Sequence, residues 1–231
     1  MPDNSRRSSM MGLTHSGLAR LRASGMAGLL ALLAFGIFVM PVVFPPGADS
    51  TSRASRILIV LILICGIAAI SEHRRLAASL AVLAAGVIAA RLVERAIPAL
   101  DIAMFHDVLL LAALVLLAIA VGINVFASRR AVADRLFGAI GLYLLLGAIW
   151  ATLYAGVANA IPNAFAGQLT TSATMFDWGY FSLVTLTTVG YGDITPVAHL
   201  ARSLAALEAL IGQLYPAIII ARLVSAHPTD A

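Results

Sequence analysis

Lysine is missing from this sequence, and charged residues of any kind are scarce. All fifteen basic residues are arginine, and charged side chains make up only 11% of the 231 residues, whereas hydrophobic ones make up 61%. Soluble domains are about half apolar and about a quarter charged. The composition therefore excludes an ordinary soluble domain and predicts an integral membrane protein. The absence of lysine indicates a biased genome and favours a bacterial source, so we expect the bacterial inner membrane.

The sequence also has little that could perform chemistry. Cys65 is the only cysteine, which excludes an intrachain disulfide, and it lies in an apolar run where a small helix residue is expected. The five histidines are scattered without the spacing of a zinc site, and no phosphate-binding or nucleotide-binding glycine motif is present. We therefore expect neither an enzyme nor an organic cofactor. The net charge of +4 does not require nucleic acid, because membrane proteins concentrate arginine in cytoplasmic loops.

Long hydrophobic runs dominate the chain instead. A helix that crosses the bilayer needs about 20 mainly apolar residues. Runs of this kind predict six transmembrane helices, over residues 25–44, 57–71, 76–97, 103–127, 136–157 and 201–224. A seventh apolar segment, 176–188, is too short to cross and is expected to be a re-entrant pore helix. The predicted fold is thus an all-α membrane protein with six transmembrane helices, one re-entrant helix and a loop after it.

The arginines predict the orientation and the division of the chain. With the N-terminus inside, the inner segments hold ten arginines and the outer ones five, as the positive-inside tendency requires. Both termini are then cytoplasmic. Three parts are predicted: an N-terminal tail at 1–24, a four-helix bundle at 25–130 and a pore domain at 131–231. The short tail and the seven residues after Val224 are expected to leave no room for a folded regulatory domain.

The segment from Thr187 to Asp193 reads T-T-V-G-Y-G-D and follows the short helix. Irregular backbone at membrane depth is tolerated only where it lines a cavity, because unpaired amides in hydrocarbon are costly. A potassium ion that sheds its water needs oxygen atoms in replacement. Backbone carbonyls of four consecutive residues can supply them, with the hydroxyl of the first as a further ligand: Thr188, Val189, Gly190 and Tyr191.

Two glycines fit this task. Carbonyls that all point to one axis require φ above zero at alternate residues, which glycine reaches at little cost, and Gly190 and Gly192 are two apart. The side chains of Val189 and Tyr191 then turn into the protein, where Tyr191 is expected to pack on an aromatic collar. The collar residues lie on the short helix: Trp178, Tyr180 and Phe181. Because one copy of the segment cannot enclose an ion, four chains around one axis are expected.

With T-V-G-Y-G at 188–192 and Asp193 after it, the region 177–224 resembles the pore domain of the potassium channel superfamily. The resemblance implies a homotetramer that conducts K⁺ passively among membrane lipids. A non-conducting subunit of a hetero-oligomer and a component of a potassium transporter are the alternatives. Some family members carry a glutamate where this chain has Val184, so Tyr180 is expected to be the partner of Asp193. Thr187 is expected to support the filter.

Three residues of the last span are candidates for gating. An ionisable group within a span indicates a functional site, and Glu208 either backs the short helix, bonding Thr185 or Thr187, or faces the pore cavity. Gly212 is either a hinge, as the resemblance implies, or a point of close helix packing. Pro216 removes a backbone hydrogen bond and predicts a bend over 212–216.

The fourth span lacks the charges of a voltage sensor. The sensor helix of voltage-gated channels, which this six-span plan resembles, carries arginine at every third position, but residues 103–127 contain none. We therefore expect no steep voltage dependence and regard 25–130 as a degenerate, sensor-like bundle. The nearest charges, Arg91 and Arg95 with Glu94, are expected to pair with Asp101 or Asp107.

Overall fold

The computed structural model describes residues 25–44, 49–71, 73–97, 102–126, 132–167 and 173–225. The first described helix covers Gly25–Val43. It contains one π-helical segment, η1 (Phe35–Val39), and ends with α2 (Met40–Val43). The other helices are α3 (Asp49–Ala69), α4 (Arg74–Ala96), α5 (Ala103–Phe126), α6 (Val132–Ala160), α7 (Met175–Leu186) and α8 (His199–Ser225). Two short strands are β1 (Phe165–Gly167) and β2 (Ile194–Pro196).

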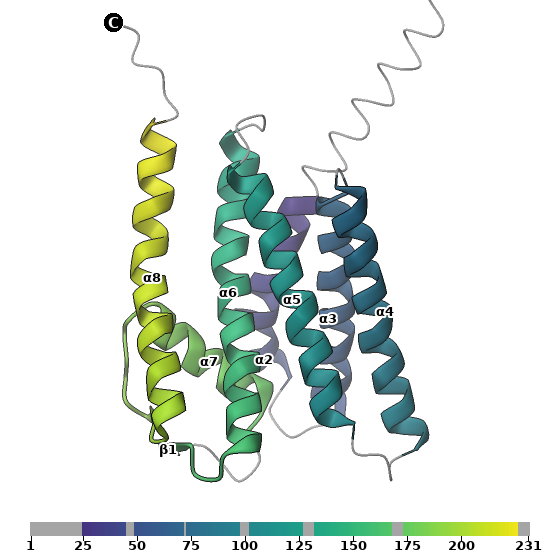
Figure 1. Ribbon diagram of the computed structural model, residues 1–231, viewed down its shortest axis with the longest axis vertical. Helices are drawn as coiled ribbons and strands as arrows, with labels where there is room; N and C mark the ends of the chain where they lie inside the picture. Colours follow the sequence, from purple (N-terminus) through teal and green to yellow (C-terminus); the bar gives the residue numbers. More distant parts are fainter. Residues whose placement is uncertain are drawn as a thin grey trace, which may run out of the picture.

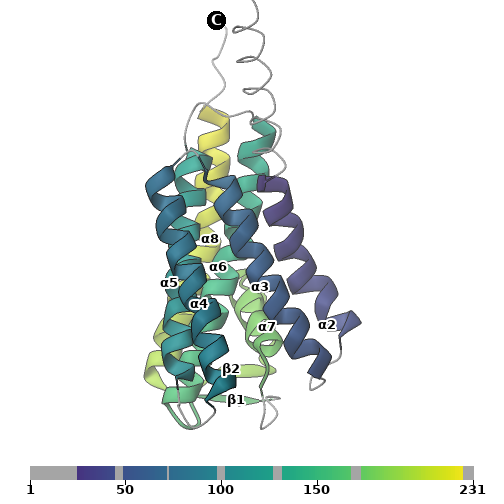
Figure 2. The same ribbon diagram turned by 90° about the vertical axis from the view of Figure 1, so that its right-hand side faces the viewer.

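The long helices run up and down a single bundle (Figure 1). Helices α3, α4 and α5 lie on one side, α6 follows, and α8 stands at the opposite side of the bundle. The short helix α7 fills the lower half of the space beside α6 and α8 and contacts both. The two strands close the lower end, as the perpendicular view also shows (Figure 2), and α8 ends at the opposite end of the bundle.

Among the described residues, five helices are long and apolar enough to cross a membrane: Gly25–Val43, Arg74–Ala96, Met104–Phe126, Arg135–Ala160 and His199–Arg222. They coincide with five of the six predicted spans to within a few residues. Helix α3 lies at the remaining one, but its apolar part, Ala54–Ala69, is shorter. The predicted tail at 1–24 lies outside the described residues.

Burial is uneven among these helices. In α6, 61% of the apolar span is buried within the chain, because this helix packs against both α5 and α7. In α8 the share is only 11%. Large apolar side chains are accordingly exposed along α8: Leu207, Leu210, Leu214, Ile218 and Ile220. Most of the apolar surface of α8 is therefore not covered by other residues of the same chain.

The strands were not anticipated from the sequence, which predicts only helices and one loop. Strand β1 pairs antiparallel with β2, with Phe165 opposite Pro196 and Gly167 opposite Ile194. The ribbon continues where the amides of Val197 and Ala198 donate to the carbonyl of Ala164. The pairing joins the segment before α7 to the segment after the filter loop, and so fixes where the loop 187–193 ends.

Candidate functional site

Helix α7 is positioned by a capping box at its N-terminus. The hydroxyl and the backbone amide of Thr174 both donate to Oδ2 of Asp177, at 2.9 and 2.6 Å, and the amide of Asp177 is paired with the Thr174 side chain. This reciprocal arrangement satisfies amides that a helix start leaves unpaired. With 12 residues the helix is about 18 Å long, which is too short for a bilayer.

Replacing Asp177 by alanine is expected to lower the free energy of unfolding by about 1 kcal/mol, because it removes the carboxylate half of the capping box. Thermal unfolding of the detergent-purified protein measures this as a midpoint lower by roughly 2–4 °C. The matched variant Asp177→Glu keeps a carboxylate at the same helix position and is expected to retain most of the stability. Equal midpoints for the alanine and glutamate variants would contradict this role.

The loop 187–193 turns back from the end of α7 and is tied to that end by backbone hydrogen bonds. The amides of Val189 and Gly190 donate to the carbonyl of Val184, at 3.0 and 3.3 Å. The hydroxyl of Thr187 donates to the carbonyl of Leu183 at 2.6 Å. Val184, the position where some channels carry glutamate, thus holds the loop through its carbonyl, and Thr187 supports the helix end.

The loop backbone alternates in the way that the sequence requires. Positive φ occurs at Thr188 (60°), Gly190 (57°) and Gly192 (80°), with ordinary values at the residues between. Glycine adopts such angles easily, whereas a β-branched residue does so only at a cost of roughly 1–3 kcal/mol. The conformation of Thr188 is therefore an outlier of the kind found at functional sites. Val189 and Tyr191 are exposed within the single chain.

Tyr180 lies beside the end of the loop. The carboxylate of Asp193 is close enough to act as an acceptor for the phenol, which raises the pKa of Tyr180 above its ordinary value; slight desolvation and the proximity of Asp193 and Tyr191 raise it further. The structure thus brings together the pair Tyr180 and Asp193 that the absence of a glutamate at 184 led us to expect.

The other two expected collar residues lie elsewhere. Trp178 and Phe181 are both 5% exposed, and the rings of both contact Phe165 of β1 at centroid distances of 4.8 and 5.5 Å. Phe181 also contacts Tyr154 of α6, at 4.8 Å. Tyr191 takes part in none of the ring contacts between described residues. Trp178 and Phe181 therefore join α7 to α6 and to the strand pair. The packing of Tyr191 on the collar in an assembly of four chains stays a prediction.

Glu208 of α8 lies behind α7, in the first of the two expected placements. The residue is completely buried, and its carboxylate accepts hydrogen bonds from the hydroxyls of Ser182, at 2.6 Å, and Tyr154, at 2.5 Å. Short distances of this kind are typical of hydroxyls that donate to a carboxylate. The partners differ from those predicted, Thr185 and Thr187. This carboxylate network, formed by Glu208, Ser182 and Tyr154, joins three helices behind the loop.

Gly212 lies one turn further along α8, against the end of α7. A β-carbon at this position would overlap with the backbone carbonyl of Leu186. The Leu186 oxygen also accepts a hydrogen bond from the Tyr143 hydroxyl, at 3.2 Å. Of the two predictions for Gly212, close packing is therefore the one that its contacts support. Helix α8 continues through Gly212 and Pro216 without interruption, so the predicted bend does not break the helix.

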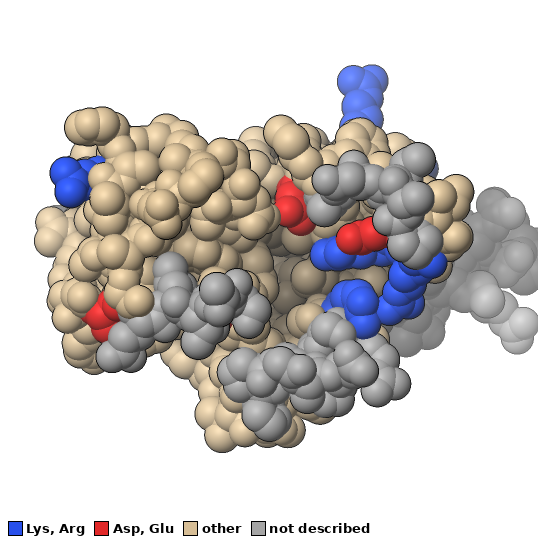
Figure 3. Space-filling model, turned by 90° about the horizontal axis from the view of Figure 1, so that it is seen from below, with Lys and Arg blue, Asp and Glu red and all other residues tan. Residues whose placement is uncertain are grey.

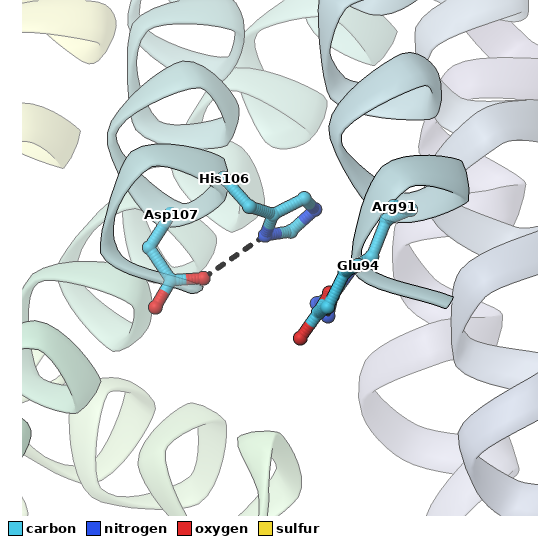
Figure 4. Close-up of polar contacts among 4 residues, drawn as sticks. All are labelled: Arg91, Glu94, His106 and Asp107. Carbon is cyan, nitrogen blue, oxygen red and sulfur yellow. Dashed lines mark hydrogen bonds and ion pairs between the residues drawn. The ribbon is translucent and has the colours of Figure 1, made fainter. Parts of the chain in front are cut away.

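On α4, Arg91 pairs with a carboxylate of its own helix. Arg91 Nη1 contacts Glu94 Oε2 at 2.9 Å, and on α5 the Oδ1 of Asp107 lies 3.1 Å from His106 Nδ1 (Figure 4). The prediction that these arginines pair with Asp107 is wrong for Arg91, and Asp101 lies outside the described residues. Within the described part of the chain, no group of three or more histidine, cysteine or carboxylate side chains is placed to hold a metal ion.

The loop and the helices that surround it belong to a known class. Residues 136–227, from α6 through α7 and the loop to α8, match the model of a family described as "Ion channel". A relative described as Protein LctB of Bacillus caldotenax is 33% identical over 107 residues, which are 44% of this chain and 79% of that protein. The chain therefore belongs to the ion channel family and is an integral membrane channel protein rather than an enzyme.

A potassium channel is among the relatives. The inward rectifier potassium channel Kirbac3.1 of Paramagnetospirillum magnetotacticum is 40% identical over 74 residues, which are 32% of this chain. A second Protein LctB, of Geobacillus stearothermophilus, is 43% identical over 63 residues, or 27% of this chain. The chain spans 23% of the length of Kirbac3.1 and 45% of that LctB. No solved structure matches the chain. These matches support membership of the potassium channel superfamily.

Proposed function

We propose that this chain is one subunit of a potassium-selective channel in which four copies surround the conduction axis. The observation that carries the proposal is the alternation of positive φ along the loop 187–193, including the β-branched Thr188. When φ changes sign at every second residue, successive carbonyls can point to the same side of the loop. Four chains would then form rings of carbonyl oxygens around the axis. Such rings replace the water of a potassium ion.

The proposed potassium ligands are the carbonyls and one hydroxyl named from the sequence, with Gly192 allowing the loop to leave the filter. The residues are Thr188, Val189, Gly190 and Tyr191. Helix α7 ends at the start of the loop, and the partial negative charge at a helix C-terminus favours a cation there. The exposed apolar face of α8 supports the tetramer, because four such faces could meet around the axis.

The contacts behind the loop favour a gate that involves the filter. Gly212 and Glu208 on α8 press directly against α7, so a movement of α8 would shift the end of the helix that holds the loop. Pro216 lies one turn beyond Gly212, on the part of α8 nearer its C-terminal end. There we propose that Ile218 to Ile220 form an apolar constriction of the pore. The filter end is proposed to face outward and both termini the cytoplasm.

The proposed channel is expected to respond weakly to voltage. Helix α5 carries no arginine, and each elementary charge that crosses the field contributes about 2.3 kcal/mol per 100 mV. Single-channel recordings between roughly −100 and +100 mV should show an open probability that changes only gradually. An open probability that rises steeply over a few tens of millivolts would contradict the account of residues 25–130.

Reconstitution tests the proposed function against its alternatives. The purified protein should have the mass of four chains, and in liposomes it should carry potassium in a flux that barium blocks. Four chains without flux would favour a non-conducting subunit of a hetero-oligomer. Flux that requires a second, energised subunit would favour a transporter component.

A further inference from the structure

A cavity of about 350 Å³ opens between α3, α4 and α5, away from α7 and the loop. Three arginines and one histidine line it together with apolar side chains: Arg56, Arg91, Arg95 and His106, with Ile57, Ile59, Val60, Val87, Ile88 and Leu92. Three of the apolar lining residues are more than 40% exposed, so the cavity is accessible from the surface of the bundle. Its volume lies within the range of small-molecule sites.

The polar part of the lining is strongly basic. It contains no carboxylate, and the two acidic side chains nearby, Glu94 and Asp107, contact Arg91 and His106. From below, blue side chains gather on the lower end of the bundle, with red acidic side chains beside them (Figure 3). Figure 4 shows His106 directed from α5 toward α4, into the space between the two helices. Such an arrangement attracts an anion.

The apolar part of the lining specifies the kind of anion. Ile88, Arg91, Leu92 and Arg95 lie along the last turns of α4, inside a helix segment apolar enough to cross a membrane. The guanidinium groups are thus next to aliphatic side chains that face hydrocarbon when the helix is embedded. Arginine binds phosphate oxygens in a bidentate manner, and aliphatic walls accept an acyl chain.

We propose that this cavity binds an anionic phospholipid, with its phosphate at the three arginines and the start of one acyl chain along the aliphatic wall. The proposal is separate from conduction: it concerns the bundle 25–126 and holds whether or not the pore conducts. Free inorganic phosphate offers the same oxygens without a chain, so the experiment must separate the two.

The test is native mass spectrometry of the full-length complex in detergent, titrated with phosphatidylglycerol or with zwitterionic phosphatidylcholine. The wild type should bind phosphatidylglycerol more tightly than phosphatidylcholine. Arg95→Gln should weaken the binding of phosphatidylglycerol about fivefold. The attraction between one arginine and an anionic headgroup corresponds to about this factor in the dissociation constant. The matched control is Arg75→Gln, which removes an exposed arginine from the other end of α4 and should leave binding unchanged.

A gain of binding guards against misfolded variants. Glu94→Gln removes the carboxylate that contacts Arg91 and should strengthen the binding of phosphatidylglycerol. The proposal is overturned if Arg95→Gln and Glu94→Gln both bind this lipid as the wild type does. Displacement of the lipid by millimolar inorganic phosphate would overturn the assignment to a phospholipid, because the acyl chain would then contribute nothing.

Discussion

Replacement of Gly212 by alanine is expected to abolish potassium flux. The added methyl group would overlap with the carbonyl of Leu186, a backbone atom at the end of α7 that cannot move without moving the loop. Leu186 is completely buried and held by the Tyr143 hydroxyl, so the strain has no flexible side chain to absorb it. Because overpacking forces backbone shifts, we expect flux in liposomes to fall at least about a hundredfold.

The matched control is Gly156→Ala in α6, where an added β-carbon meets no atom within 4 Å. Alanine in a helix interior is more favourable than glycine by up to about 1 kcal/mol, so this variant should conduct normally and be slightly more stable. If Gly212 were a hinge without tight packing, Gly212→Ala would still assemble and conduct, with altered opening. Normal flux in Gly212→Ala would contradict the packing role.

Replacement of Glu208 by alanine is expected to have the second largest effect. The buried hydroxyl of Tyr154 loses its acceptor, and the space of the carboxylate is left empty. Together these changes should lower the free energy of unfolding by about 2 to 4 kcal/mol. Thermal unfolding in detergent measures the loss, and the open filter should become less stable in recordings because α7 loses its link to α8.

Two further variants isolate the network from the charge. Glu208→Gln retains an acceptor for Tyr154, and Ser182 can donate instead to the carbonyl of Gly147, which lies 2.9 Å from its hydroxyl. This variant should keep its conductance and change only the rate of inactivation. In the double variant Tyr154→Phe, Glu208→Ala the two losses should not add, since the partners are removed together. A large loss of conductance in Glu208→Gln would instead place the carboxylate in the ion path.

The sequence predicts those features that depend on local pattern. Long apolar runs place the spans because a helix must satisfy its own amides in hydrocarbon. The filter loop is predictable because Gly190 and Gly192 are spaced for positive φ. The capping box of α7 was missed, although a threonine followed three residues later by an acidic residue is a recognisable start signal.

Contacts between segments far apart in the chain could not be predicted from local sequence patterns. Ser182 and Tyr154 reach Glu208 across 26 and 54 residues, and an isolated carboxylate in a span does not indicate its donors. The strand pairing of Phe165 with Pro196 depends on the return of the loop beside the linker. The same closure turns Trp178 and Phe181 toward Phe165, which adjacency in sequence alone does not predict.

The selectivity of the reconstituted protein tests the central claim most directly. With potassium on one side of a planar bilayer and sodium on the other, the reversal potential gives the ratio of the two permeabilities. The proposed carbonyl rings predict a strong preference for potassium, at least about tenfold, together with block by barium. Equal permeability to sodium and potassium in a protein that assembles as four chains would contradict the account of Thr188 to Tyr191 as a potassium filter.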